Sequence, residues 1–281
     1  MKIAIFGSNG MLGRYVTSYL SKQACYSVTT FTRKEFDILK SDFSHESMPN
    51  VSQFDYIINC AGIVKSLCDK YTDSEIYKVN SIFPKILAER SKNLIHISTD
   101  CVFLGKTNSE NYENSASLIY PLDLYGRSKL LGEPSESIKA LTIRTSIIGE
   151  ESRGDSFIEF VKKNNGKEIN GYVNHYWNGV TCLELAKFID SCIDIAAFDH
   201  NGEVKFPSNI IHFYSPEIVN KYELCQLVAH VYDLNIKINQ HKTKDCYRNL
   251  KSLYTISQKY CTTDILSQIK EQKEWGEKYF K

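Results

Sequence analysis

The sequence predicts an α/β fold in which a doubly wound parallel sheet is followed by a smaller C-terminal α/β region. Three observations lead to this prediction. Short apolar runs alternate with amphipathic segments, a glycine-rich stretch directly follows the first run, and the 281 residues contain no repeat or linker-like tract. Strands that are separated by helices require right-handed crossovers, which produce a parallel sheet covered on both faces.

The N-terminal half supplies most strands of the predicted sheet. Residues 2–6 are the first apolar run, and a helix is predicted after them from the helical spacing of Leu12, Val16, Tyr19 and Leu20. Further strands are predicted at residues 27–31, 54–60, 94–98 and 141–146. The first of these is rich in β-branched residues, as strands commonly are.

A capping box predicts where the next helix begins. Thr72 and Glu75 have the spacing of such a box, and Pro84 lies further along, where it removes one backbone donor. Apolar residues recur through this segment at helical intervals: Ile76, Val79, Phe83, Ile86 and Leu87.

Weaker signals continue towards the C-terminus. Thr181 and Glu184 predict another capping box, at the start of a helix near residues 181–195 that we expect to pack back on the first domain. Residues 210–214 are strand-like. Asn220 is then expected to cap a helix that carries Leu224, Leu227, Val228 and Val231.

Composition excludes several classes of protein. With 34 basic and 33 acidic residues, the net charge of +1 offers no basic surface to nucleic acid or an anionic membrane. A 42% hydrophobic content excludes a disordered chain, and no apolar run approaches the roughly 20 residues of a membrane span. We recognise no secretory leader. The nine cysteines are scattered without a CxxC pair and the seven histidines lack ligand spacing, so we expect reduced thiols, a cytoplasmic location and no metal site.

Gly7, Gly10 and Gly13 form the first candidate for a functional site. They lie between an initial strand and an amphipathic helix, which is the setting of a dinucleotide-binding loop. Glycines there let backbone amides approach a pyrophosphate, and the helix N-terminus attracts negative charge. The spacing is GxxGxxG, and a simple tight turn is the alternative, but the position after the first strand favours cofactor binding. Residues 1–150 are therefore predicted to be a Rossmann-type NAD(P)-binding domain, and residues 151–281 mainly a substrate-binding region.

Tyr125 and Lys129 form the second candidate, because four residues of helix place both side chains on one face. The lysine charge would stabilise the phenolate and lower the pKa of the tyrosine, as proton transfer near neutral pH requires. Such a pair arises by chance in a chain with 18 tyrosines, so its position is the evidence. It follows Ser98, Thr99 and Asp100 at the end of the fourth strand, and ligands bind outside the carboxyl ends of such strands. The combination indicates hydride transfer.

These motifs resemble those of the extended short-chain dehydrogenase/reductases, and within them the dTDP-4-dehydrorhamnose reductase family. The resemblance is close over about residues 1–150 and looser through residues 177–186 and 212–224. It rests on the following strings: Gly7-Ser-Asn-Gly-Met-Leu-Gly13, Asn59-Cys-Ala-Gly62, Val79-Asn80, Ser98-Thr-Asp-Cys-Val-Phe103, Tyr125-Gly-Arg-Ser-Lys-Leu-Leu-Gly-Glu133 and Arg144-Thr-Ser146.

The resemblance implies roles for individual residues. Tyr125 would protonate the carbonyl oxygen as a nicotinamide delivers hydride, Lys129 would lower the pKa of that tyrosine and hold the nicotinamide ribose, and Thr99 would hydrogen-bond the same carbonyl. The cofactor would contact Gly7, Asn9, Gly10, Met11, Leu12, Gly13, Arg33, Asp37, Ile38, Cys60, Ala61, Gly62, Asn80, Ser98, Tyr125 and Lys129. The substrate would contact Val64, Lys65, Asp100, Cys101, Val102, Phe103 and Trp177.

The end of the second strand favours NADPH as the cofactor. An acidic residue there would bind the adenosine ribose and repel a 2′-phosphate, but the strand runs into Arg33 and Lys34, with no acid before Glu35. Arg33 offers a planar fork of donors to a phosphate, and Arg14 in the first helix is placed to reach the same group. Solvated surface charges are the plain alternative, and NADH is kept as a second cofactor.

The resemblance therefore implies an NADPH-dependent reductase that acts on the 4-keto group of a nucleotide-activated 6-deoxy sugar, for a surface polysaccharide such as O-antigen. The default substrate is dTDP-4-dehydro-L-rhamnose. A UDP-linked N-acetylamino-4-hexulose competes with it, because residues 63–67 and 107–117 depart from the family pattern. The assembly is left open, with a homodimer among the alternatives.

Two other functions are weighed against this one. The related GDP-fucose synthases use a cysteine near the position of Cys101, with a histidine partner, for epimerisation. No histidine occurs at residues 157–160 and His175 has a different context, so a plain buried thiol is favoured. A non-catalytic regulatory subunit would keep the cofactor fold, but both Tyr125 and Lys129 are present, which favours catalysis.

Overall fold

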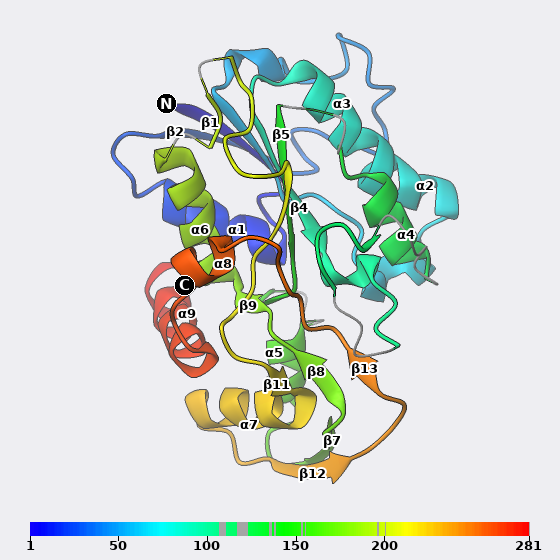
Figure 1. The fold of residues 1–281 in the computed structure, drawn as a ribbon, viewed down its shortest axis with the longest axis vertical. Coiled ribbons are helices and arrows are strands. Elements are labelled where there is room, and N and C mark those ends of the chain that lie inside the picture. The colour runs from blue at the N-terminus through cyan, green and yellow to red at the C-terminus, as the bar shows by residue number, and fades with distance from the viewer. Residues whose placement is uncertain are drawn as a thin grey trace.

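The structure, a computed structural model, describes residues 1–106, 111–116, 123–134, 137, 139–152, 154, 156–195, 197–199 and 201–280. Its main sheet has six parallel strands in the order β10–β5–β4–β3–β1–β2 (Figure 1). The strands are β1 (Lys2–Phe6), β2 (Ser27–Phe31), β3 (Tyr56–Asn59), β4 (Leu94–Thr99), β5 (Ala140–Thr145) and β10 (Ile210–His212). The predicted doubly wound parallel sheet is thereby confirmed, and the direction of winding reverses between β1 and β3.

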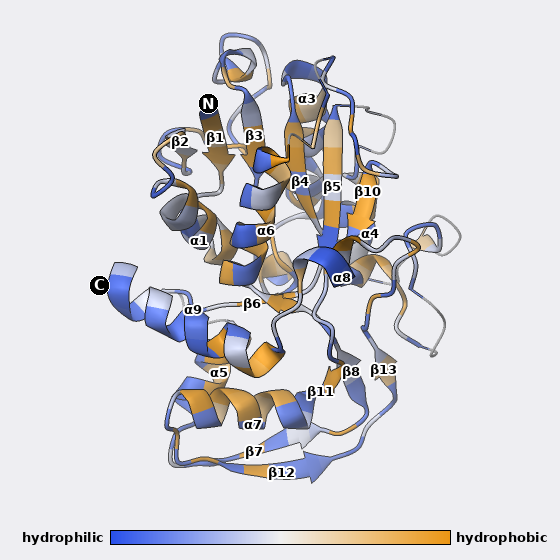
Figure 2. Cartoon of the chain, turned by 60° about the vertical axis from the view of Figure 1, so that its left-hand side comes forward, coloured by the Kyte–Doolittle hydropathy of each residue, from blue (hydrophilic) through white to orange (hydrophobic). Residues whose placement is uncertain are grey.

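Helices cover both faces of this sheet (Figures 1 and 2). One face carries α1 (Met11–Leu20) and α6 (Cys182–Asp194), and the other carries α2 (Asp73–Tyr77), α3 (Phe83–Arg90) and α4 (Leu124–Leu131). Neighbouring residues of a strand point to opposite faces, so in β1 Ile3 and Ile5 join the core with α1 and α6, while Ala4 and Phe6 join the core with α3.

The helix predicted after Thr72 is present but interrupted. α2 begins with the complete capping box between Thr72 and Glu75, and residues 78–82 then form a π-helical turn before α3. Pro84 lies at the start of α3, where its missing N–H removes one bond of a regular helix. The π turn directs Asn80 towards α4, where its side chain hydrogen-bonds Ser128.

The C-terminal half contributes to two parts of the molecule. Its helix α6 and strand β10 belong to the layers of the main sheet, and the domain boundary at residue 150 stays a prediction. A lower region, seen at the bottom of Figure 1, holds two further helices, α5 (Phe157–Lys163) and α7 (Lys221–Val231). Short strands join these elements: β6 (Ile147–Ile148) with β9 (Val180–Thr181), β7 (Glu168–Tyr172) with β12 (Lys237–His241), and β8 (His175–Trp177) with β11 (Val219–Asn220) and β13 (Cys246–Tyr247).

The chain ends in two helices, α8 (Ile256–Tyr260) and α9 (Ile265–Tyr279), which return to the α1 and α6 side of the sheet. A contact with α9 alters the capping box predicted at Thr181. The box expected at Thr181 is only half formed, because the N–H of Thr181 donates to the Gln268 side chain of α9 at 3.1 Å, while its hydroxyl accepts from the N–H of Glu184. Asn220 forms its complete box with Glu223.

Two expectations from composition can be compared with the structure. All nine cysteines are free thiols. Among the described residues, we find no helix whose length and hydropathy would let it cross a bilayer.

Candidate active site

The turn between β1 and α1 is shaped by its glycines. Gly7 has a φ of +76°, and a Cβ there would lie 2.7 Å from the backbone of Ala61. A Cβ on Gly13 would lie 2.1 Å from the carbonyl oxygen of Gly7, so neither position accepts a side chain. Gly10 caps α1 without a side-chain hydrogen bond, which leaves the first helical N–H groups available to an anion. The cradle therefore fits a pyrophosphate.

This turn opens on a cavity of ≈ 540 Å³, within the range of about 300–1,000 Å³ that is usual for ligand sites. Most of the predicted cofactor residues line it, namely Gly7, Asn9, Gly10, Arg33, Asp37, Ile38, Cys60, Ala61 and Gly62. Arg14, Lys34, Glu151 and Ser152 line it as well. The cavity lies where the winding of the sheet reverses, between β1 and β3, and a dinucleotide is the ligand that its lining fits.

Arg33 faces this cavity from the end of β2. Its guanidinium Nη2 donates to the hydroxyl of Tyr71 at 2.8 Å, and the guanidinium carbon lies 5.7 Å from the centroid of the Tyr71 ring. Glu35, the first acid after the strand, accepts hydrogen bonds from the backbone N–H and the hydroxyl of Thr32. Asp37 accepts one from the N–H of Leu39 at 3.1 Å.

The other predicted cofactor residues lie behind this lining. Leu12 is buried in the core of the main sheet, and Met11 packs against that core. Asn80 clamps the loop after β3, since its Oδ1 accepts from the N–H of Ile63 at 2.8 Å and its Nδ2 donates to the carbonyl oxygen of the same residue at 2.9 Å. Ser98 donates to Glu133 at 2.6 Å. These side chains support the site through packing and hydrogen bonds.

The structure brings the three predicted catalytic residues to the carboxyl end of β4. Thr99 is the last residue of that strand, and α4 places Tyr125 and Lys129 one turn apart. Asp123 caps α4 by accepting a hydrogen bond from the N–H of Gly126 at 2.7 Å, which fixes the start of the helix beside the strand. The Thr99 hydroxyl donates to the Asp100 carboxylate at 3.1 Å and lies close enough to Tyr125 to influence its pKa.

Burial is the largest influence on the pKa values of Tyr125 and Lys129. Burial raises the pKa of Tyr125, against the opposing influence of the nearby Thr99 hydroxyl, so the phenol is protonated at neutral pH. Burial also lowers the pKa of Lys129 to about 8, and the ammonium donates to the carbonyl oxygen of Ile97 at 2.7 Å. Burial thus outweighs any lowering of the Tyr125 pKa by Lys129 in this structure, and the expected effect of Lys129 on that pKa stays a prediction.

Three cationic side chains approach the segment that follows Thr99. Arg248 donates to the carbonyl oxygens of Asp100 and Phe103, at 3.3 and 2.6 Å. Lys65 pairs with Asp123 at 2.9 Å. The ammonium of Lys221 lies over two aromatic rings, 5.0 Å from the centroid of Trp177 and 4.8 Å from that of Phe157.

Sequence reasoning missed Lys221 and Arg248. Nothing in the sequence marks Arg248, because its position follows from the pairing of β13, which it directly follows, with the distant strand β8. The remaining predicted substrate residues differ in exposure. Val102, Phe103 and Trp177 are buried, whereas 41% of Val64 is exposed. Burial and the neighbouring Asp100 raise the pKa of the Cys101 thiol to about 12, and His175 is engaged with Thr243 at 2.8 Å.

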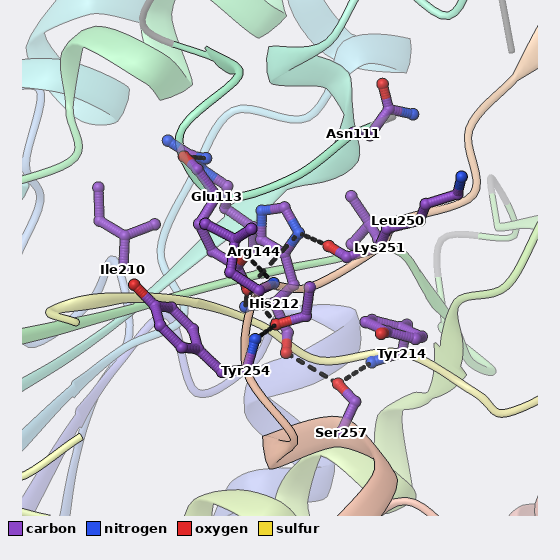
Figure 3. A network of polar contacts seen from close by, with 12 residues as sticks. Asn111, Glu113, Arg144, Ile210, His212, Tyr214, Leu250, Lys251, Tyr254 and Ser257 are labelled. Atoms are coloured by element: carbon purple, nitrogen blue, oxygen red, sulfur yellow. Dashed lines mark hydrogen bonds and ion pairs between the residues drawn. The ribbon is translucent and has the colours of Figure 1, made fainter. Parts of the chain in front are cut away.

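Figure 3 shows a buried polar network around Glu113, Arg144 and His212. Arg144 of β5 pairs with Glu133, which lies just after the end of α4, and its Nη1 donates to the carbonyl oxygen of Glu113 at 2.8 Å. The Glu113 carboxylate accepts the N–H groups of His212 and Leu253, at 3.1 and 2.9 Å. Burial lowers the pKa of His212 to about 4, so its ring is neutral near pH 7. Through these contacts the network joins residues 248–253, the segment that begins with Arg248, to Ser98 near the end of β4. Residues 107–110 and 117 of the segment that departs from the family pattern lie outside the described residues.

A parallel sheet with a glycine turn, a ligand-sized cavity at the reversal of its winding, and a Thr/Tyr/Lys set beyond β4 define a dinucleotide-dependent oxidoreductase of the short-chain dehydrogenase/reductase type. The family model described as the RmlD substrate binding domain matches residues 1–252. The chain belongs to this family.

Named relatives and a solved structure agree with this assignment. A dTDP-4-dehydrorhamnose reductase of Aggregatibacter actinomycetemcomitans is 30% identical over 237 residues, which cover 79% of this chain and 76% of that protein. The spore coat polysaccharide biosynthesis protein SpsK of Bacillus subtilis is 28% identical over 239 residues, which cover 81% of this chain and 78% of that protein. The match to the dTDP-4-dehydrorhamnose reductase of Mycolicibacterium smegmatis, at 29% identity, covers 58% of this chain and only 50% of that relative.

The crystal structure of dTDP-4-dehydrorhamnose reductase from Bacillus anthracis in complex with NADP superimposes with a TM-score of 0.78. The alignment covers 98% of both chains at 19% identity, so the likeness shows the fold.

Proposed function

We propose that this protein uses NADPH to reduce the 4-keto group of a nucleotide-activated 6-deoxy sugar, in the synthesis of a surface polysaccharide. The observation that carries the proposal is the proximity of the Thr99 and Tyr125 side chains at the carboxyl end of β4, with Lys129 one turn further along α4. The names of the relatives, which include dTDP-4-dehydrorhamnose reductases and a polysaccharide biosynthesis protein, support the substrate class.

Different residues of the site would bind the cofactor, hydrogen-bond the substrate and transfer the proton. The glycine turn, Arg14 and Arg33 would hold the cofactor in the cavity, and when bound it supplies the hydride. The hydroxyls of Thr99 and Tyr125 would both hydrogen-bond the keto oxygen. Because burial keeps the phenol protonated, Tyr125 can give its proton to that oxygen as negative charge develops there. The Lys129 ammonium would then stabilise the phenolate that is left.

Cys101 favours reduction over an epimerase-reductase function. Burial and Asp100 keep its thiol protonated, and a protonated thiol is a poor base for removing a proton from a sugar carbon. We therefore place Cys101 in the wall of the substrate site without a proton-transfer role.

Lys221 and Arg248 would bind the diphosphate of the sugar nucleotide. Arg248 is fixed to the segment directly after Thr99, and Lys221 is held over Trp177 in the neighbouring region. Replacing either residue by methionine should raise KM for the sugar nucleotide about tenfold or more and leave the affinity for NADPH unchanged, because a charge-assisted hydrogen bond contributes about 1.5–3 kcal/mol. Lys237→Met, which removes an exposed partner of Glu168, is the matched control.

The function is tested by incubating the protein with NADPH and either dTDP-4-dehydro-L-rhamnose or a UDP-linked N-acetylamino-4-hexulose, while absorbance at the reduced-cofactor band is followed. Oxidation of NADPH with the dTDP sugar supports dTDP-4-dehydro-L-rhamnose as the substrate, and oxidation with the UDP sugar alone moves the assignment to that class. If the protein binds NADPH but no 4-keto sugar nucleotide causes that NADPH to be oxidised, a non-catalytic regulatory subunit would be favoured.

A further inference from the structure

Helix α9 lies beyond residue 252, where the match to the family model ends, but it is attached to the cofactor side of the molecule. The Gln268 side chain accepts the backbone N–H of Thr181 at the start of α6. The indole N–H of Trp275 donates to the Ser18 hydroxyl of α1 at 3.2 Å. These contacts hold the end of the chain against the helix that follows the glycine turn, and Figure 2 shows α9 running out to the C-terminus on this side.

The last described residue, Phe280, packs against the first turn of α1. Its ring centroid lies 3.8 Å from the guanidinium carbon of Arg14, and the Tyr15 ring meets it edge-on at 4.7 Å. A guanidinium that stacks its flat face on an aromatic ring keeps its N–H donors free in the plane of the group. Phe280 therefore fixes the position of the Arg14 charge without occupying its donors.

The Arg14 side chain lines the same cavity as the glycine turn. Within the described part of the chain, no hydrogen bond or ion pair engages its guanidinium, which lies over the Phe280 ring. Arg33, which also lines the cavity, donates instead to the hydroxyl of Tyr71. An arginine with free donors, immobilised in a cavity beside a helix N-terminus, is a binding group for phosphate.

We propose that Arg14 binds a phosphate group of the dinucleotide and that Phe280 is its positioning residue, so that the C-terminal end of the chain completes the cofactor site. The inference rests on the proposed use of a dinucleotide. The phosphate has two sources, the pyrophosphate that NADH and NADPH share and the 2′-phosphate that only NADPH carries.

Calorimetric titration of the full-length protein with NADPH and, separately, with NADH tests the inference without any sugar substrate. We expect Arg14→Ala to weaken NADPH binding about tenfold or more, and Phe280→Ala to weaken it about three- to tenfold. Phe280→Tyr keeps the ring and should bind within about twofold of the parent. Equal losses for both cofactors place the pyrophosphate at Arg14, and a loss confined to NADPH places the 2′-phosphate there.

The neighbouring residue supplies a matched control. Tyr279 stacks its ring on the Lys22 ammonium at 3.5 Å, and neither residue lines the cavity. Tyr279→Ala removes a contact of the same kind and should leave cofactor binding unchanged. The combined Arg14→Ala, Phe280→Ala variant should bind no more weakly than Arg14→Ala alone, since Phe280 acts through Arg14.

Three results would overturn the inference: parental affinity in Phe280→Ala, an equal loss in Tyr279→Ala, or a further loss in the combined variant. The midpoint of thermal unfolding without cofactor, measured for each variant, shows whether the fold is intact. Failure of the parent protein to bind either dinucleotide is a distinct outcome, and it would remove the proposed function itself.

Discussion

The Glu133 carboxylate accepts two hydrogen bonds from the Arg144 guanidinium, at 2.8 Å from Nε and 2.7 Å from Nη2. The two side chains are 2% and 3% exposed, so the pair is almost completely withdrawn from water. Ser98 donates to the same carboxylate at 2.6 Å. One carboxylate therefore joins the end of α4 to the ends of β4 and β5, and it sets the distance between the strand that carries Thr99 and the helix that carries Tyr125.

Removal of one member of this pair should destabilise the protein strongly. Arg144→Met leaves a buried, uncompensated carboxylate, and such a change costs about 3–5 kcal/mol of the free energy of unfolding. Urea denaturation measures the loss. Lys237→Met, which breaks the exposed pair with Glu168, should cost less than about 1 kcal/mol. An Arg144→Met protein as stable as that control would contradict the importance assigned to the buried pair.

Turnover should fall as pH rises through about 8. The pKa of Lys129 is lowered to about 8, so its ammonium loses its charge above that pH and no longer stabilises the phenolate of Tyr125. A profile of kcat against pH should show this step, and Lys129→Met should lack it while turning over about a hundredfold or more slowly. A fall at the same pH in the methionine variant would assign the step to another group.

The same shift affects stability in the opposite direction. The unfolded chain binds the Lys129 proton more tightly than the folded protein does, so the charged lysine lowers the free energy of unfolding. This penalty is present in full below about pH 8, and it disappears as pH rises towards the ordinary lysine pKa of about 10.5. Lys129→Met should therefore stabilise the protein at pH 7, and the gain should shrink by pH 10. Denaturation at the two pH values measures the difference.

Tyr125→Phe should lose most of the activity and keep the cofactor site. The phenol is the proton donor, and removal of a general acid typically slows a reaction by about 10²- to 10⁴-fold. NADPH affinity, measured by titration, should stay within about twofold of the parent because Tyr125 does not line the cavity. Equal turnover in the variant and the parent would refute the proton-donor role.

Arg33→Ala should raise the KM for NADPH by about tenfold or more and change that for NADH little, since one charge-assisted hydrogen bond to the 2′-phosphate accounts for such a ratio. Tyr71→Phe keeps the arginine and removes its 2.8 Å hydrogen bond, so we expect a smaller change of the same selectivity. Use of both cofactors with equal efficiency by the parent, or an equal loss for both in Arg33→Ala, would show that this arginine does not select NADPH.

Local signals account for what the sequence predicted well. The glycine turn, the apolar runs, the capping box at Thr72 and the helix cap at Asn220 are each determined by a few adjacent residues, so the elements that they predict are present in the structure. The placement of Thr99 near Tyr125 followed from one rule, that ligands gather beyond the carboxyl ends of parallel strands.

Features that join distant segments were not predictable in this way. Arg248 reaches Asp100 across 148 positions of sequence, and nothing near it in the chain indicates that contact. The half-formed cap at Thr181 has the same cause, because the acceptor of its N–H is Gln268, 87 positions later. The charge state of Tyr125 depends on burial, which spacing alone does not reveal.

The sixth strand of the main sheet has a consequence for the order of folding. β10 supplies the pairing partner of β5, but it is encoded about 65 residues later, so a growing chain exposes the edge of β5 until the C-terminal region has emerged from the ribosome. A fragment that stops at residue 150 would keep that edge open and would lack α6, which covers part of the core. We expect such a fragment to aggregate, and co-expression with the missing segment to restore a soluble complex.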